Sequence, residues 1–393
     1  MHSTASMPSR VASRLRPFGG TIFTEMTQLA RRFNAVNLGQ GAPDFDGPEF
    51  VKEAGIRAIH AGQAQYARSF GVPELNAAIA ARFRRDTGLT VDPDAEVTVT
   101  SGCTEAIAAT MLGLIEPGDE VILIEPFYDS YPATVAMAGG TARSVTLRPP
   151  HFALDAVALR AAVTARTRAI VVNTPHNPTG RVFTKAELEV VAALCRERDL
   201  LCIADEVYER LVFEGEHISI ATFPGMFERT VTLSSLGKSF SLTGWKIGWA
   251  IAPPHLTAGV RAAHQFLTFA AATPLQHGSI TALQAGDEYD RAFVAEYRKR
   301  RDYFVAGLAD AGFTVFPPQG TYFVMADHTR FGFDDDMAFC RWLVEEIGVA
   351  AIPPGSFYQS RADGRSLVRF AFCKRDETLR AAIERLRRLK SRA

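Results

Sequence analysis

Short apolar runs alternate with longer stretches of helical periodicity through the middle of the chain. Six short runs, most of them continuously apolar, predict strands over residues 96–100, 121–124, 169–173, 201–205, 230–234 and 248–252. Helices are predicted over the Ala-rich segment 103–115 and over 184–198. Apolar strands that alternate with helices are typical of a sheet buried on both faces. We therefore predict an α/β fold with a mostly parallel central sheet flanked by helices.

The pattern changes after about residue 290. A helix is predicted over 287–311, and then short strands near 313–316, 321–325 and 366–372 and helices near 335–346 and 376–390. Such a mixture is typical of a smaller α+β domain. We expect an N-terminal arm that forms part of this small domain (1–48), a large domain (49–290) and a C-terminal small domain (291–393).

Composition and charge narrow the possible functions. Lys and Arg number 43 and Asp and Glu also 43, so the net charge is +0 and favours neither nucleic acid nor an anionic membrane surface. No apolar run approaches the roughly 18 residues that span a bilayer. The five cysteines are scattered and include no CxxC pair, which argues against a disulfide framework and a zinc site. We expect a cytoplasmic protein with reduced thiols.

The polar motifs fall at the ends of predicted strands, where α/β sheets bind their ligands. Lys238 follows the strand 230–234 in a small, hydroxyl-rich turn. A desolvated lysine amine there can form an imine with an aldehyde, although a solvated loop lysine is the simpler alternative. Ser235 and Lys246 are predicted to contribute to a phosphate site.

Asp205 ends the apolar strand 201–205, where a buried acid needs a cationic or hydrogen-bonding partner. A protonated pyridine nitrogen is such a partner, and Tyr208 is close enough in sequence to reach a phenolic oxygen on the same ring. The alternative for Asp205 is a helix N-cap. Asn177 lies in a rigid turn before Pro178 and can donate to an oxygen, unless this turn binds no ligand.

Three further segments indicate an anion, a flat ring and a carboxylate. A helix start at Gly102, Cys103 and Thr104 leaves free backbone N–H groups for an anion. Phe127 and Tyr128 follow a strand, and one of these two aromatic rings can stack on a flat cofactor. Arg369 lies inside an apolar strand, where its fork suits a bidentate carboxylate or an internal salt bridge.

In this order, the motifs resemble those of the class I/II aminotransferases, the fold-type-I enzymes of the aspartate-aminotransferase superfamily that use pyridoxal 5′-phosphate (PLP). The resemblance extends from about residue 17 to 390. It implies that Lys238 forms a Schiff base with PLP and then moves the substrate α-proton as base and acid. It also implies that Asp205 binds the pyridine nitrogen and that Asn177 and Tyr208 bind the phenolic oxygen. The further contacts that it implies are Tyr128 and Val207 on the ring, Gly102, Cys103, Thr104, Ser235 and Lys246 on the phosphate, and Arg369 and Gly41 on the substrate α-carboxylate.

Segments 20–24, 37–45, 65–71 and 264–269 resemble the methionine and kynurenine/glutamine aminotransferases in particular. This subgroup implies that Phe23 and Phe357 line the side-chain pocket, and that Tyr66 enters the site from the partner subunit of a homodimer. The implied substrates are an apolar, aromatic or sulfur-containing L-amino acid and a 2-oxo acid. Ala42 replaces a bulkier aromatic residue of the subgroup, which is expected to widen the pocket.

Three alternatives share the predicted cofactor. A cysteine-conjugate β-lyase would use the same residues and release pyruvate and ammonia. A specialised biosynthetic PLP enzyme would act on an unusual amino acid. A PLP-sensing regulator would need a DNA-binding module, and segment 1–48 is too short and lacks a helix-turn-helix pattern. None of these requires a metal ion.

Overall fold

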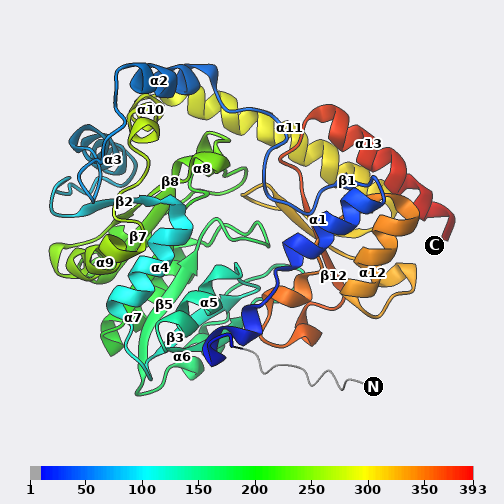
Figure 1. The fold of residues 1–393 in the computed structure, drawn as a ribbon. Helices are drawn as coiled ribbons and strands as arrows, with labels where there is room; N and C mark the ends of the chain where they lie inside the picture. Colours follow the sequence, from blue (N-terminus) through cyan, green and yellow to red (C-terminus); the bar gives the residue numbers. More distant parts are fainter. Residues whose placement is uncertain (1–9, 393) are drawn as a thin grey trace, which may run out of the picture.

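The computed structural model describes residues 10–392, so the first nine residues of the predicted N-terminal arm lie outside the described part. Its centre is a seven-stranded sheet with the strand order β2-β8-β7-β6-β5-β3-β4 (Figure 1). The strands are β2 (Val97–Ser101), β3 (Glu120–Glu125), β4 (Thr141–Thr146), β5 (Thr167–Asn173), β6 (Leu201–Asp205), β7 (Thr230–Ser235) and β8 (Ile247–Ile251).

The prediction of a mostly parallel sheet is confirmed. Strands β4, β3, β5, β6 and β7 pair in parallel, and β8 runs antiparallel to both of its neighbours, β2 and β7. The edge strand β4 was not predicted, because its sequence TARSVT is polar and only partly buried. Edge strands commonly carry such charged and polar side chains, which hide them from a search for apolar runs.

Helices cover both faces of this sheet, which explains why its inner strands are continuously apolar. Val121 and Leu123 of β3 pack with α4, α5 and α9, whereas Ile122 and Ile124 of the same strand pack with α6 and α7. Successive side chains of a strand point to opposite faces, so both sets must be apolar. The bounds of these helices are α4 (Gly102–Leu114), α5 (Ser130–Met137), α6 (Ala156–Ala162), α7 (Lys185–Arg198) and α9 (Pro254–Leu267).

A third group of helices closes the β2–β8 side of the sheet. Apolar residues of α3 pack there with Val97, Val99, Trp249 and Ile251, and α10 packs on α2 and α3. The helices of this region are α2 (Glu49–His60), α3 (Pro73–Thr87), the single turn α8 (Leu236–Ser239) and α10 (Thr273–Leu283).

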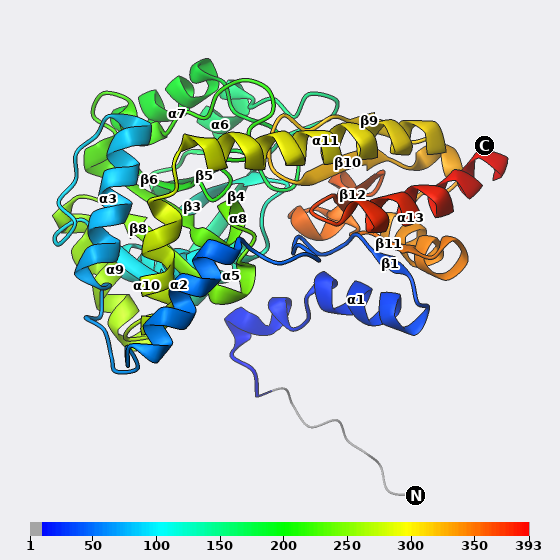
Figure 2. The same cartoon turned by 90° about the horizontal axis from the view of Figure 1, so that it is seen from above.

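The chain beyond this sheet forms a second region with its own hydrophobic core. The long helix α11 runs along the top of both regions (Figure 2) and leads to an antiparallel three-stranded sheet of order β12-β10-β9. The strand β1 pairs in parallel with β11, which joins the segment before the large sheet to the C-terminal part of the chain. These elements are α1 (Ile22–Arg32), β1 (Val36–Asn37), α11 (Asp287–Ala311), β9 (Thr314–Phe316), β10 (Phe323–Asp327), α12 (Asp336–Trp342), β11 (Val349–Ala350), β12 (Leu367–Ala371) and α13 (Asp376–Leu386).

The domain boundaries near residues 48 and 290 stay a proposal. They agree with the start of α11 at Asp287 and with the pairing of β1 with β11. Among residues 10–392, no helix combines the length and the apolar character needed to cross a membrane.

Candidate active site

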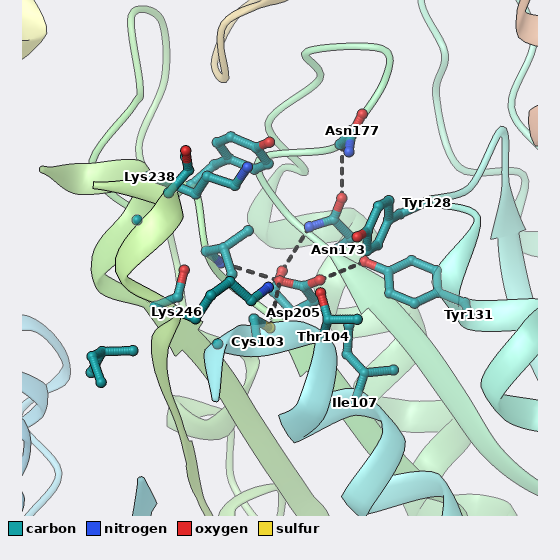
Figure 3. A pocket seen from close by; sticks show the side chains of 17 residues that line it. Cys103, Thr104, Ile107, Tyr128, Tyr131, Asn173, Asn177, Asp205, Lys238 and Lys246 are labelled. Carbon is teal, nitrogen blue, oxygen red and sulfur yellow. Dashed lines mark hydrogen bonds between the residues drawn. The ribbon is translucent and has the colours of Figure 1, made fainter. Parts of the chain in front are cut away.

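A cavity of about 200 Å³ lies at the carboxyl ends of the parallel strands (Figure 3). Asn173, Asp205 and Ser235, the last residues of β5, β6 and β7, all line it. Parallel strands end at one edge of a sheet, so residues far apart in sequence meet there. The structure brings most of the predicted cofactor residues to this cavity: Gly102, Cys103, Thr104, Tyr128, Asn177, Asp205, Val207, Tyr208, Ser235, Lys238 and Lys246.

Asp205 is buried and is held by hydrogen bonds on the floor of the cavity. The Tyr131 hydroxyl donates to its Oδ2 at 2.7 Å, and the Val207 backbone N–H donates to its Oδ1 at 3.3 Å. No helix follows β6 directly, so Asp205 is not a helix N-cap. Burial raises the pKa of the Asp205 carboxyl, while the bond from Tyr131 and the nearby Lys238 charge oppose that rise. A cation placed against this carboxylate would stabilise its charged form.

Lys238 enters the cavity from the single helical turn that follows β7. Its Nζ donates to the Tyr322 hydroxyl at 2.9 Å and lies 5.6 Å from the centre of the Tyr208 ring. Burial lowers the pKa of the Lys238 amine below its ordinary value. A larger share of this amine is therefore neutral near pH 7, the form that attacks carbonyl carbons and accepts protons.

The start of α4 and Lys246 lie close together on the wall of the cavity. Gly102 has a φ of +75°, and a Cβ there would come within 3.0 Å of Lys246 Nζ. Glycine therefore lets the Lys246 ammonium group lie close to the helix start, whose first N–H groups can bind an anion. Among residues 10–392, no carboxylate forms an ion pair with Lys246, which leaves its charge available for a phosphate.

Arg369 lies on β12 in the second region. It contacts Asn177, which lines the cofactor cavity. Its guanidinium donates to Asn177 Oδ1 at 3.3 Å and to the Gly39 carbonyl at 2.8 Å. Its Nε is buried and has no hydrogen-bond partner among the described residues. Burial lowers the pKa of Arg369 to about 10, so the group stays charged near neutral pH. A buried, charged and unsatisfied donor of this kind is suited to bind a carboxylate.

Aromatic side chains surround this guanidinium. Its central carbon lies 5.2 Å from the Phe23 ring centre and 5.1 Å from that of Phe357. These two rings are 5.9 Å apart and come from α1 and from the segment before β12. The Gly41 carbonyl is close by and accepts from the Tyr322 hydroxyl at 2.7 Å. The four residues predicted for the substrate from the two ends of the chain therefore lie in one region.

Tyr66 does not line the cavity of its own chain. It is 85% exposed and contacts only the Phe269 ring edge-on among aromatic residues, at 5.2 Å. Phe266, on α9, is 89% exposed. Large aromatic side chains exposed in this way are typical of surfaces that bind another protein.

Three residues at the site were missed by the sequence reasoning. Tyr131 bonds Asp205, and Asn173 accepts the backbone N–H of Asn177 at 2.7 Å (Figure 3). Tyr322 bonds Lys238. Asn173 ends a predicted strand and so carried a usable signal. Tyr131 follows Tyr128 by one helical turn, a weaker signal. Tyr322 belongs to the second region, just before β10, and nothing in the local sequence indicates that it reaches the site.

The model of the family described as aminotransferase class I and II matches residues 34–386. The chain belongs to this family. The solved structure of N-succinyldiaminopimelate aminotransferase from Mycobacterium tuberculosis is similar to this aminotransferase at a TM-score of 0.94 and 51% identity, covering 96% of this chain and 99% of that one. The resemblance to class I/II aminotransferases and the fold-type-I architecture are thereby confirmed.

Two further relatives support the predicted subgroup. Methionine aminotransferase from Escherichia coli is 40% identical and covers 96% of this chain and 98% of its own length. Kynurenine–oxoglutarate transaminase from Dictyostelium discoideum is 37% identical and covers 95% of each. The chain is a PLP-dependent transaminase close to these enzymes.

The cavity fits PLP. The ring nitrogen needs an acid, and Asp205 is a buried carboxylate with room beside it. The phosphate needs anion-binding groups, and the start of α4 at Gly102 and the Lys246 ammonium group both line the cavity. The aldehyde needs an amine, and Lys238 Nζ lies in the same cavity. When bound, PLP supplies this aldehyde and a protonated ring that accepts electron density from the substrate α-carbon.

Proposed function

We propose that this transaminase takes the α-amino group from an apolar, aromatic or sulfur-containing L-amino acid and passes it to a 2-oxo acid. The unsatisfied Nε of Arg369, whose guanidinium lies beside the Phe23 and Phe357 rings, carries this proposal. The guanidinium suits the α-carboxylate, and the rings offer an apolar surface to the side chain next to it. A carboxylate side chain would gain nothing from these rings.

The proposed residue roles follow the geometry. Asp205, held by Tyr131, binds the pyridine nitrogen, and the Asn177 amide and Tyr208 hydroxyl bind the phenolic oxygen. Burial raises the pKa of Tyr208, so its hydroxyl keeps the proton that it donates. Tyr128 and Val207 contact the ring. The phosphate is assigned to Gly102, Cys103, Thr104, Ser235 and Lys246, and the substrate to Arg369, Gly41, Asn177, Phe23 and Phe357.

Lys238 is the proposed proton carrier. Its amine has a lowered pKa, lies in the cavity and is held by the Tyr322 hydroxyl. Once free of the covalent linkage, Nζ removes the proton of the substrate α-carbon and returns it to the cofactor carbon to which Lys238 was linked. Tyr322 in turn donates to the Gly41 carbonyl, which fixes the orientation of the hydroxyl that receives the Lys238 bond. A positioned base of this type contributes about 10²- to 10⁴-fold to the rate.

We further propose a homodimer in which Tyr66 of each chain enters the site of its partner. The 85% exposure of Tyr66 and the exposed Phe266 and Phe269 support an interface on this side of the large domain. We place the enzyme in the cytoplasm, because all five cysteines are free, as is usual in a reducing compartment.

A second candidate donor is an N-succinylated diaminopimelate, the substrate class named for the relative with 51% identity. Ala42 supports it, because a small residue beside Gly41 leaves room for a long side chain. Such a donor still presents an α-amino acid end to Arg369 and needs a wider channel beyond the rings.

An absorption spectrum of the purified enzyme tests these proposals. The band of the Lys238–cofactor linkage should be lost on adding methionine, phenylalanine or kynurenine and should return on adding a 2-oxo acid. Loss of the band with N-succinyldiaminopimelate alone would decide for the second candidate. Release of pyruvate and ammonia from a cysteine conjugate, without amino transfer, would decide for the β-lyase alternative.

A further inference from the structure

A second, smaller cavity lies behind the cofactor site. Its volume is about 60 Å³, and Glu206, Glu209, His217 and Ser234 contribute polar groups to it. Ile79 and Phe83 of α3 and Trp249 and Ile251 of β8 complete the wall, so this cavity is on the α3 side of the sheet. The cofactor cavity lies at the carboxyl edge of the same sheet and extends to Ile107 of α4 on the opposite face. The two cavities therefore share the turn after β6 and the end of β7.

Glu209 connects this turn to this strand end. Ser234 Oγ lies 3.2 Å from one Glu209 carboxylate oxygen and 3.1 Å from the other. On the backbone, the Glu206 N–H donates to the Leu233 carbonyl at 2.8 Å, and the Glu209 N–H donates to the Glu206 carbonyl at 2.9 Å. The Ser234–Glu209 bond is therefore a second link between the turn after β6 and the end of β7, besides the backbone bond from Glu206 to Leu233.

The residues on either side of this bond hold the cofactor in the proposed function. The end of β6 and the turn after it carry Asp205 and Tyr208 into the cofactor cavity, and the end of β7 continues into Ser235 and Lys238. Side chains alternate along a strand, so Ser234 faces α3 while Ser235 faces the cofactor. A shift of Ser234 against Glu209 therefore moves Lys238 relative to Asp205 and Tyr208.

Other charged groups near Glu209 have partners of their own. Glu206 bonds His217 at 3.2 Å and Ser219 at 2.8 Å. Arg82 binds Asp290 at 2.8 Å, and Arg210 pairs with Asp86 and Asp290. Within residues 10–392, Glu209 forms no ion pair, and Ser234 is its one side-chain hydrogen-bond partner. Packing alone does not call for a carboxylate here, because burying one with a single hydroxyl partner is costly.

We propose that Glu209 is a positioning residue for transamination: through Ser234 it sets the distance between the turn of Asp205 and Tyr208 and the strand end that leads to Lys238. The inference rests on the proposed function, because the residues it positions are the ones that hold the cofactor there. In this role Glu209 contacts neither the cofactor nor the substrate.

The test compares three variants of the full-length holoenzyme. Glu209→Ala and Ser234→Ala remove the bond from either side, whereas Glu209→Gln keeps an oxygen that accepts from the Ser234 hydroxyl. Two quantities are measured: the pH at which the absorption band of the Lys238–cofactor linkage titrates, and the dissociation constant of PLP. Both alanine variants should shift that titration and weaken PLP binding about tenfold, in line with the cost of small misplacements in active sites. Glu209→Gln should restore both quantities to near wild type.

Glu120→Ala is the matched control. Glu120 is 1% exposed and bonds Thr164 and Arg166, but it begins β3 and so lies at the opposite end of the parallel strands. Its loss should lower the melting temperature and leave the linkage titration and PLP affinity unchanged.

The proposal is overturned if Glu209→Ala and Ser234→Ala keep the wild-type titration and PLP affinity, whatever their melting temperatures. It is also overturned if Glu209→Gln behaves like Glu209→Ala, because the acceptor oxygen would then not be the operative group. If Glu209→Ala does not fold, Ser234→Ala decides, since it loses only a hydroxyl. A wild-type protein that fails to bind PLP or to transfer an amino group would instead refute the proposed function.

Discussion

At the scale of single residues, the site depends on keeping a buried carboxylate charged. Burial raises the pKa of Asp205, and the 2.7 Å bond from Tyr131 is the shortest contact that opposes this rise. Cys103 contributes less, because its Sγ is 3.8 Å from Asp205 and burial raises the pKa of its thiol well above the ordinary value. A neutral Asp205 would no longer attract a protonated ring nitrogen.

The variant Tyr131→Phe tests this dependence. Hydrogen bonds to charged groups contribute about 1.5–3 kcal/mol, so PLP affinity and turnover should each fall roughly tenfold or more. The acidic limb of the pH–rate profile should also move to higher pH, because Asp205 then gains a proton more readily. Tyr128→Phe, which keeps the stacking ring and lacks contact with Asp205, is the control. A Tyr131→Phe enzyme with the wild-type pH profile would contradict the assignment.

The variant Lys238→Ala tests the base. We expect no covalent cofactor linkage by mass spectrometry after borohydride reduction and a loss of turnover of at least about 10²-fold, the lower end for a positioned base. Lys185→Ala, at the exposed start of α7, is the control and should keep the covalent cofactor linkage and the wild-type turnover. Near wild-type turnover by the Lys238 variant would refute the role proposed for this residue.

At the scale of elements, helix α4 holds its start against the turn that carries Lys246. Gly248 of β8 permits this approach, because a Cβ there would meet the backbone of Gly102 and Cys103 at 2.6 Å. Gly102 itself combines a positive φ with a close neighbour, so it carries both a conformational and a spatial requirement.

The variant Gly102→Ala separates these two requirements when it is paired with Gly62→Ala. Gly62 has a φ of +76°, close to the +75° of Gly102, but a Cβ added at Gly62 would meet no atom within 4 Å. Both changes should lower stability by about 1 kcal/mol in chemical denaturation through backbone strain. Only Gly102→Ala should weaken PLP binding, about tenfold, as measured by fluorescence titration. Equal PLP affinity in the two variants would show that the helix start is not part of the phosphate site.

At the scale of the whole molecule, the cavity behind the cofactor site links stability to pH. Burial raises the pKa of Glu209 to about 7, although His217, Arg82 and the Ser234 bond oppose the rise. Glu206 pairs with His217, and Asp86 and Asp290 partly neutralise Arg82 and Arg210. A raised folded-state pKa of an acid means that the folded protein binds the proton more tightly than the unfolded chain does.

The stability that this proton contributes is therefore fully present below about pH 4.5, the ordinary glutamate value, and is lost as the pH rises through about 7. Glu209→Gln removes the dependence, so the variant should gain about 2 kcal/mol over wild type between pH 5 and 8. Urea unfolding at several pH values measures the difference. A difference that stays constant across this range would show that Glu209 does not titrate in the folded protein.

Much of this protein could be predicted from its sequence because the deciding forces are local. Apolar runs and helical periodicity determine β3, β5, β6 and α11, and the motifs around Lys238, Asp205 and Asn177 stand at strand ends that any parallel sheet brings to one edge. The polar edge strand β4 and the antiparallel direction of β8 could not be predicted in this way, because strand direction and edge position depend on neighbouring strands rather than on the local pattern.

Tertiary structure alone decided the contacts that tune the chemistry. Tyr131 against Asp205, Tyr322 against Lys238, and Glu209 against Ser234 each join segments between 25 and 84 residues apart. Such pairs leave no periodic trace, because one hydroxyl at the right distance suffices and many sequence positions can supply it. The sequence therefore determined the reaction class, because its key residues are charged or polar side chains at the ends of buried strands, where such side chains are unusual. The pKa values and distances on which that reaction depends arose only when the chain folded, because desolvation and hydrogen bonding are properties of the packed interior.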